Sequence, residues 1–114
     1  MDDKRHHRVR MEAMYPHAYQ FLGFLGANAD TYVHDRLQKT IDEEVTEGHP
    51  ETVAQVIAEL DAAIKHMPIT YAELEDIANY VIESDAEAKT LLTTLRDGLR
   101  EGLAQKSAAE SKQF

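Results

Sequence analysis

Apolar residues recur at three- and four-residue spacing along most of this 114-residue chain, and this periodicity constrains the fold more than any other feature. Such spacing places apolar side chains on one face of a helix, whereas a strand alternates every second residue. The chain has no strand-like alternation of useful length, and proline and glycine divide it into helical segments. The sequence therefore predicts an all-α protein, a compact bundle of about five antiparallel helices.

The first three predicted helices are delimited by proline, glycine and capping residues. The first begins at Pro16 and runs to about residue 24, before Gly26 and Asn28 interrupt it. Asp30 is expected to cap a second helix, which ends at Gly48. The third covers residues 50–66 and has the clearest amphipathic pattern. Its apolar stripe contains Val53, Val56, Ile57, Leu60 and Ile64.

Two capping boxes mark the starts of the fourth and fifth predicted helices. They are TYAE at residues 70–73 and SDAE at residues 84–87. In such a box, the hydroxyl of the first residue accepts a hydrogen bond from the backbone N–H of the glutamate three residues later, and the glutamate side chain accepts one from the backbone N–H of the first residue. The fourth helix is expected to continue through Val81. The inward face of the fifth is expected to contain Ala88, Leu91, Leu92, Leu95, Leu99 and Leu103.

Length and patterning predict a single domain. We assign the helical bundle to residues 15–105. Residues 1–14 are expected to form a flexible basic extension. Residues 106–114 lack an apolar face and are expected to form a frayed tail.

Aromatic residues concentrate in and just after the first predicted helix. Five of the eight rings in the chain are Tyr15, Tyr19, Phe21, Phe24 and Tyr32. The other helices offer mainly Val, Ile, Leu and Ala, so we expect these rings to fill the centre of the bundle.

The net charge of −9 is unevenly distributed, because residues 40–88 contain thirteen Asp and Glu residues against one lysine. Such a surface repels nucleic acid and anionic membranes but attracts a cationic protein. The predicted partner-binding residues are Asp42, Glu43, Glu44, Glu47, Glu73, Glu75 and Asp76. The first four oppose the dipole of their helix, which makes them the better candidates. Acidic faces also serve simply to keep a protein in solution, and both roles remain open.

Residue types and spacing argue against catalysis and metal binding. The chain has no cysteine, no Glu-x-x-His pair, no H-E-x-x-H motif and no glycine-rich phosphate loop. Ser84 is explained as a helix cap and the other two serines fall in the tail. We therefore expect no enzyme activity, no catalytic residues, no metal and no cofactor. No apolar run approaches the ~18 residues of a membrane span and no leader is recognisable, which favours a cytoplasmic location.

The block YPHAYQFLGFLG, which begins at Tyr15, resembles the opening of the small immunity proteins of bacterial contact-dependent growth inhibition systems. The segment ETVAQVIAELDAAI at residues 51–64 and the leucine-rich helix at residues 91–103 are also similar to that family. The chain departs from the family pattern in having no tryptophan. The resemblance implies an all-helical cytoplasmic protein that neutralises the toxin domain of a cognate exported effector, frequently a nuclease.

An alternative from another class is a homo-oligomeric structural or regulatory protein whose aromatic first helix forms the subunit interface. An immunity protein is expected to be a monomer or a weak homodimer when free. The alternative requires stable self-association, so the two hypotheses differ in oligomeric state.

Overall fold

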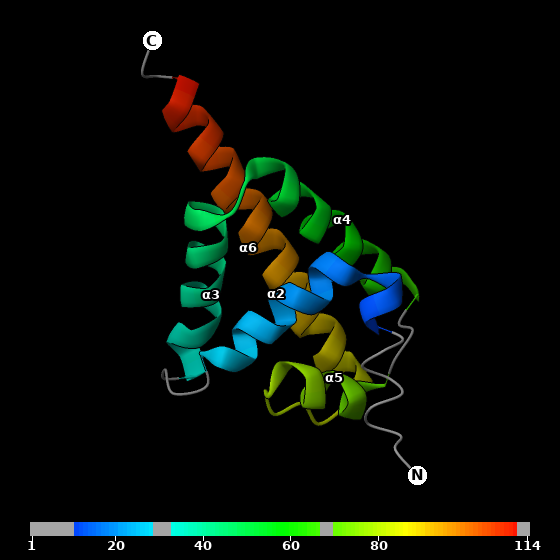
Figure 1. Cartoon of the computed structure of the whole chain (residues 1–114). Helices are drawn as coiled ribbons and strands as arrows, with labels where there is room; N and C mark the ends of the chain where they lie inside the picture. The colour runs from blue at the N-terminus through cyan, green and yellow to red at the C-terminus, as the bar shows by residue number, and fades with distance from the viewer. Residues whose placement is uncertain (1–10, 29–32, 67–69, 112–114) are drawn as a thin grey trace.

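Figure 1 shows the computed structural model of the protein, which is a compact all-α bundle as predicted. The structure describes residues 11–28, 33–66 and 70–111. Residues 11–14 are helical, and the longer helices are α2 (Pro16–Ala27), α3 (Val33–Glu47), α4 (Pro50–His66), α5 (Tyr71–Ala78) and α6 (Asp85–Ser111).

The local signals for helix starts are confirmed wherever the structure describes them. Proline stands at the beginning of α2 and of α4. The Thr70 hydroxyl accepts a hydrogen bond from the N–H of Glu73, and the Ser84 hydroxyl accepts one from the N–H of Glu87. These bonds satisfy N–H groups that have no partner inside the first turn of a helix. The predicted cap Asp30 and the predicted stop at 67–68 lie outside the described residues.

Three predicted helix ends are wrong. Helix α2 continues to Ala27, three residues past the expected end. Helix α5 stops at Ala78, because Asn79 adopts a left-handed conformation with φ of 49°. Val81 is therefore not on a helix and is 75% exposed. Helix α6 continues to Ser111, well beyond the end expected near residue 105.

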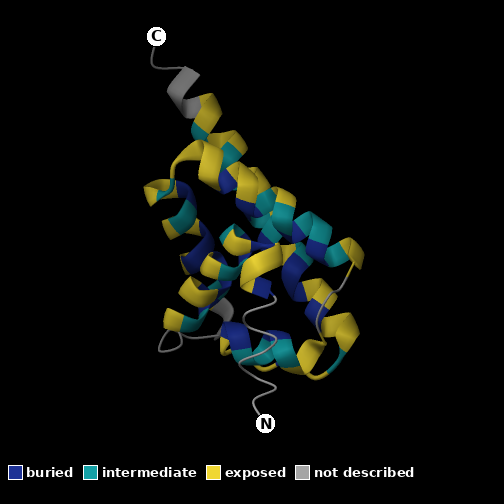
Figure 2. Cartoon of the chain, turned by 45° about the vertical axis from the view of Figure 1, so that its right-hand side comes forward, coloured by how far each residue is buried: buried dark blue, intermediate teal, exposed yellow. Residues whose placement is uncertain are grey.

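The bundle has α2 on one side of the core and α6 on the other. Helix α6 packs against α3, α4 and α5, and α2 packs against the same three helices. Figure 1 shows α4 and α6 running in opposite directions, with α2 crossing obliquely in front of α6. Buried faces point inward and exposed residues cover the outside (Figure 2). Leu22, Leu60, Leu74 and Leu95 illustrate the core, because each has 1% or less of its surface exposed.

The domain boundary at residue 14 needs correction. Met11 is 1% exposed and belongs to the core. Its carbonyl accepts a hydrogen bond of 2.8 Å from the N–H of Tyr15. The short helical turn at 11–14 is thus part of the folded unit and not of a flexible extension.

The aromatic residues behave as expected with one exception. Phe21 is completely buried, Tyr15 is buried and Tyr19 is half-buried against the core. Phe24 is 47% exposed, so the prediction that this ring fills the core is wrong. Tyr32 lies outside the described residues.

Arg36 on α3 holds two helix ends together. It is 5% exposed, and its Nε donates to the carbonyl of Leu25 in the last turn of α2 at 2.9 Å. Its Nη2 donates to the carbonyls of Ala78 and Asn79 at the end of α5, at 2.8 and 2.6 Å. Carbonyls at a helix C-terminus carry partial negative charge, which suits a guanidinium. Burial lowers the pKa of this guanidinium.

Glu59 on α4 caps the beginning of α2. Its Oε1 accepts from the backbone N–H groups of His17 and Ala18, at 2.8 and 3.0 Å. Its Oε2 lies 2.7 Å from the Nδ1 of His17. A carboxylate at a helix N-terminus satisfies unpaired N–H groups and complements the helix dipole. This acidic residue is therefore used to position α2.

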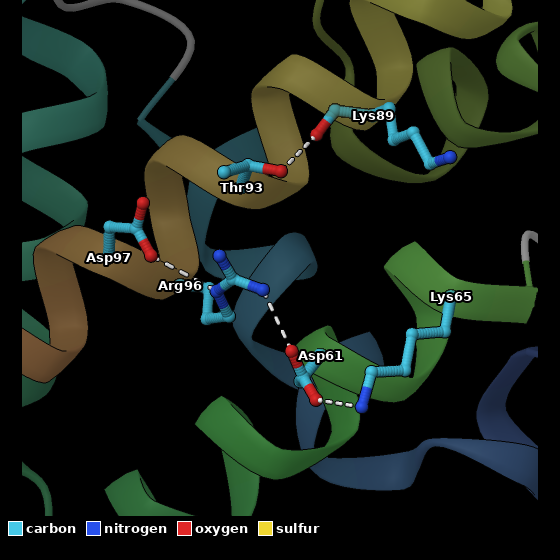
Figure 3. Close-up of polar contacts among 6 residues, drawn as sticks. All are labelled: Asp61, Lys65, Lys89, Thr93, Arg96 and Asp97. Carbon is cyan, nitrogen blue, oxygen red and sulfur yellow. Dashed lines mark hydrogen bonds and ion pairs between the residues drawn. The ribbon is translucent and has the colours of Figure 1, made fainter.

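Asp61 on α4 also has a structural role, because it forms an ion pair with Arg96 on α6 (Figure 3). Its Oδ1 lies 2.7 Å from Nη1 of Arg96, and its Oδ2 lies 3.1 Å from Nζ of Lys65. The hydrogen bond from Lys65, and then that from Arg96, lower the pKa of the Asp61 carboxyl. Arg96 is also bonded to the neighbouring Asp97. The conspicuous carboxylates of the sequence thus include several that maintain the fold.

Two glycines let α3 approach α6 closely. A Cβ atom on Gly98 would lie 2.6 Å from Cδ1 of Ile41, and one on Gly102 would lie 2.9 Å from Cγ2 of Val45. Both contacts are shorter than normal carbon–carbon packing distances. The absence of side chains at these two positions therefore sets the position of α3, which carries the best acidic candidates.

Among the described helices, we find none that combines the length and the apolar character needed to cross a membrane.

Candidate functional site

The structure separates the predicted partner-binding residues into two groups. Asp42, Glu43, Glu44 and Glu47 lie on the C-terminal half of α3. Glu73, Glu75 and Asp76 lie on α5. Figure 1 shows α5 at the opposite end of the molecule from the last turns of α3. The two groups therefore form separate surfaces and not one continuous acidic face.

The α5 group is partly used for folding. Glu75 Oε1 accepts a hydrogen bond of 2.9 Å from the N–H of Ile82, which is buried. This bond holds the connection between α5 and α6 against α5. Glu73 and Asp76 are half-buried. Glu75 and Asp76 line a shallow depression of about 510 Å³ beside Val81. We regard this group as the weaker candidate, because its best-placed carboxylate already has a structural partner.

The α3 group borders a groove between α2, α3 and the start of α4. Its volume is about 410 Å³. We call it the acidic groove, and its described lining consists of Gln20, Phe24, Ala27, Asn28, Thr40, Glu43, Glu44, Glu47, Gly48 and Thr52. One wall is a stripe of α2 with four-residue spacing, and the other is a stripe of α3 with three- and four-residue spacing. Asp42 is not among the lining residues.

Hydrogen bonds fix the inner end of the acidic groove. The side-chain amide of Asn28 donates to the hydroxyl of Thr40 at 2.8 Å and to Oε1 of Glu43 at 3.3 Å. The Thr40 hydroxyl in turn donates to the carbonyl of Arg36 at 2.8 Å. Asn28 also ends α2, since its N–H bonds the carbonyls of Phe24 and Leu25. The end of α2 and the middle of α3 are thereby held at a defined separation.

Asp42 lies on a different face of α3. It is exposed, and its Oδ1 accepts a hydrogen bond of 2.8 Å from Nε2 of Gln38 one turn earlier. Such a pair is typical of a solvated helix surface. Asp42 can therefore contribute to the rim of an interface, but not to the acidic groove itself.

The charge around the acidic groove is one-sided. The described lining contains three carboxylates, on Glu43, Glu44 and Glu47, and no lysine or arginine. Burial raises the pKa of the Glu44 carboxyl, because its charged form loses hydration there. The last turn of α3 also contains no basic residue. Nζ of Lys106 on α6 donates to the Val45 carbonyl at 2.9 Å and only partly offsets the charge at this helix end.

The arrangement is suited to binding a positively charged group. The described residues contain no group of three or more His, Cys, Asp or Glu that could hold a metal ion. The site is a groove with an anionic wall on α3 and a wall on α2 that carries amide groups and one aromatic ring. A positively charged side chain of another protein meets complementary chemistry on both walls.

Sequence reasoning identified three residues of the acidic groove and missed the others. It assigned Phe24 to the core and gave Gln20, Asn28 and Thr52 no role in binding. The sequence did contain a signal for the three residues on α2. Gln20, Phe24 and Asn28 follow one another at four-residue spacing and therefore share one face of that helix. Only the packing of α2 against α3 shows that this face borders the carboxylates.

Comparison with known proteins gave no relative: no protein-family model, no curated protein and no solved structure matches this chain.

Proposed function

We propose that this protein binds a cationic protein and neutralises it through the acidic groove and the exposed part of α3 around it. The observation that supports this best is the convergence of Glu43, Glu44 and Glu47 on one groove whose described lining has no basic residue. Carboxylates that share a groove with no basic lining residue repel one another and are better satisfied by a cationic partner. Asp42 would lie at the edge of the contact.

The biological role that we propose is that of an immunity protein in a contact-dependent growth inhibition system. The support is the resemblance of the segment from Tyr15 to Gly23, together with the acidic character of the site. A nuclease toxin has to present cations to phosphate groups. A protein with a dense anionic surface can occupy those cations, and attraction at long range accelerates the encounter. The proposed partner is therefore the nuclease domain at the end of a cognate exported effector.

The first experiment tests whether a partner of this kind exists. The toxin-like C-terminal domain encoded beside this gene is co-expressed with the full chain and the complex is purified. We expect a stoichiometric complex in which the toxic activity is inhibited. A neighbouring gene that encodes no such domain, or a domain that neither binds nor is inhibited, would overturn the immunity role.

The second experiment tests where that partner binds. The triple variant Glu43→Gln, Glu44→Gln, Glu47→Gln is compared with a matched triple variant of equal charge change, Glu12→Gln, Glu83→Gln, Glu101→Gln. These control residues are exposed and do not line the acidic groove. We expect the first variant to slow association about tenfold at low salt and to flatten its salt dependence. Equal association rates for the two variants would place the contact elsewhere.

Self-association through the aromatic first helix has less support. Phe21, Leu22 and Leu25 are completely buried within the subunit, which leaves Phe24 as the large apolar side chain of α2 that is exposed to a second copy. Sedimentation of the full chain across a concentration range measures this directly. Stable dimers or larger species at micromolar concentration would favour the alternative.

A further inference from the structure

We infer that the acidic groove receives one arginine side chain of the partner protein, with its guanidinium stacked on the ring of Phe24 and hydrogen-bonded to the facing carboxylates of α3. This inference rests on the proposed function and specifies how the partner is recognised. Its basis is the combination of a groove, an exposed aromatic ring and one-sided charge at the same place.

The first argument concerns Phe24. Its ring is 47% exposed although other rings of the same segment, such as Phe21, are buried. A phenylalanine exposed to this extent gains less for the fold than a fully buried one, and here it forms part of the wall of a concave site. The face of an aromatic ring attracts a cation held within about 6 Å of its centre. A ring and several carboxylates around one groove match the two properties of a guanidinium, a flat apolar face and a rim of N–H donors.

The second argument concerns the carboxylates. Glu47 lies one turn after both Glu43 and Glu44, at four- and three-residue spacing, so its side chain neighbours each of them on the surface of α3. Two adjacent carboxylates can accept several of the five N–H donors of one guanidinium. Burial raises the pKa of Glu44, which means that its ionised form is held at a cost in the free protein. A cation in the groove removes part of that cost.

The third argument selects arginine over lysine. An ammonium group is a compact, strongly hydrated charge, whereas a guanidinium is planar and stacks on rings with less loss of hydration. The protein itself contains such a pair, because the guanidinium carbon of Arg36 lies 5.2 Å from the centre of the Tyr80 ring. That pair lies within the fold, and it is an example in this chain of the guanidinium–ring contact inferred for Phe24.

The fourth argument concerns size. A volume of about 410 Å³ is near the lower end of pockets that hold small ligands. It suits one long side chain and not a helix or a strand of the partner. Arginine side chains that enter pockets at the centre of an interface are frequent among the residues that dominate binding energy. The surrounding exposed surface, including Asp42, would then provide the weaker rim contacts.

The test uses the isotopically labelled full chain and three small probes: capped arginine, capped lysine and capped citrulline. Citrulline has the shape of arginine without its charge. We expect capped arginine to give saturable NMR shifts at Asn28 and Thr52, capped lysine to bind more weakly, and capped citrulline to give none. The variant Phe24→Leu keeps every charge and should weaken arginine binding about two- to fivefold. Glu47→Gln should weaken it as well, whereas Glu101→Gln on the surface of α6 should not.

Several outcomes overturn the inference. They are equal shifts with citrulline and arginine, tighter binding of lysine, unchanged arginine binding in Phe24→Leu, and shifts that map to α5 instead of the acidic groove. If the toxin domain still binds through the carboxylates of α3 while these probes fail, the arginine site is wrong and the proposed function stands. If arginine binds as expected but no toxin domain is neutralised, the site stands and the immunity role is wrong. Because Phe24 is half exposed, the leucine variant is expected to fold normally, and its spectrum verifies this.

Discussion

Replacing Arg36 tests whether one buried side chain holds the ends of α2 and α5 in place. The variant Arg36→Met keeps most of the apolar stem and removes the guanidinium. Three hydrogen bonds are lost, from Nε to Leu25 and from Nη2 to Ala78 and Asn79. These bonds involve a charged donor and buried or partly buried carbonyls. We therefore expect their removal to lower the free energy of unfolding more than the removal of surface hydrogen bonds would.

The magnitude follows from the number and type of bonds. Hydrogen bonds with a charged partner contribute roughly 1.5 kcal/mol or more each, so three of them amount to about 4.5 kcal/mol. Removing the guanidinium also removes the cost of taking a charge out of water. We therefore expect the free energy of unfolding to fall by about 3 kcal/mol. For a domain of this size that corresponds to a decrease in Tm of roughly 10 °C.

Urea denaturation followed by far-UV circular dichroism measures this loss, with the midpoint and slope fitted together. The matched control is Arg100→Met on the exposed face of α6, where we expect a change within about 0.5 kcal/mol. Arg36→Lys should recover only part of the stability, since an ammonium cannot reach both helix ends from one position. A loss below about 1 kcal/mol for Arg36→Met, or a loss equal to that of the control, would refute the assigned role.

Four further changes test other contacts by the same denaturation assay. Glu59→Ala should lower the free energy of unfolding by about 1–2 kcal/mol, because it removes the cap of α2. Glu59→Gln retains an acceptor and should lower it less. Equal decreases for the two variants would contradict the capping role. Gly98→Ala should lower the free energy of unfolding by about 1 kcal/mol. Overpacking against Ile41 destabilises by about 1–3 kcal/mol, and the higher helix propensity of alanine stabilises by about 1 kcal/mol. Adding Ile41→Val removes the clashing Cδ1 atom, so the two changes should couple favourably in a double-mutant cycle. The pKa of Asp61 is lowered in the folded protein, so its ionised form stabilises the fold at pH values above the ordinary pKa of aspartate. This contribution to the free energy of unfolding is lost as the pH falls through the lowered pKa. The variant Asp61→Asn should lack this acid-sensitive contribution. Burial raises the pKa of Glu44, so its ionised form opposes folding at neutral pH; the glutamine variant should be at least as stable as the parent at pH 7, and a clear loss of stability would contradict this.

Features that depend on neighbouring residues in the sequence could be predicted well. The third predicted helix has the observed bounds of α4, because proline starts it and its apolar stripe is regular. Both capping boxes formed the expected hydroxyl-to-backbone bond because only three residues separate the partners. Helix propensity and capping are local properties, so a single sequence contains enough information to locate them.

Features that depend on distant residues could not be predicted. Arg36 finds its acceptors at the end of α5, more than forty residues away, and nothing in its local sequence marks it as buried. Glu59 resembled any other exposed carboxylate until the start of α2 was placed beside it. Val81 continues the helical spacing of apolar residues, but α5 ends at Ala78 because Asn79 adopts a left-handed conformation, so Val81 lies outside the helix.

The site was predictable only in part for the same reason. Charge patterning selected Glu43, Glu44 and Glu47, which line the acidic groove, because they oppose the dipole of α3. The same dipole argument ranked Glu75 lower, but it did not show that Glu75 accepts a hydrogen bond from Ile82 and holds the connection between α5 and α6. It also gave no reason to place Phe24 beside the carboxylates of the acidic groove, since an aromatic residue in an apolar helix is usually buried.

The contrast between the two kinds of carboxylate is itself an argument for function. Glu59 and Asp61 each have N–H donors or cations within hydrogen-bonding distance, so their charges are balanced within the fold. Around the acidic groove the same protein leaves three carboxylates without a basic neighbour among the described lining residues, buries Glu44 at a cost and exposes the ring of Phe24. The raised pKa of Glu44 shows that burial disfavours its ionised form, and a neutral residue at this position would not carry that cost. Binding sites commonly retain residues that stability alone would remove, which supports the proposal that a cationic partner occupies this groove.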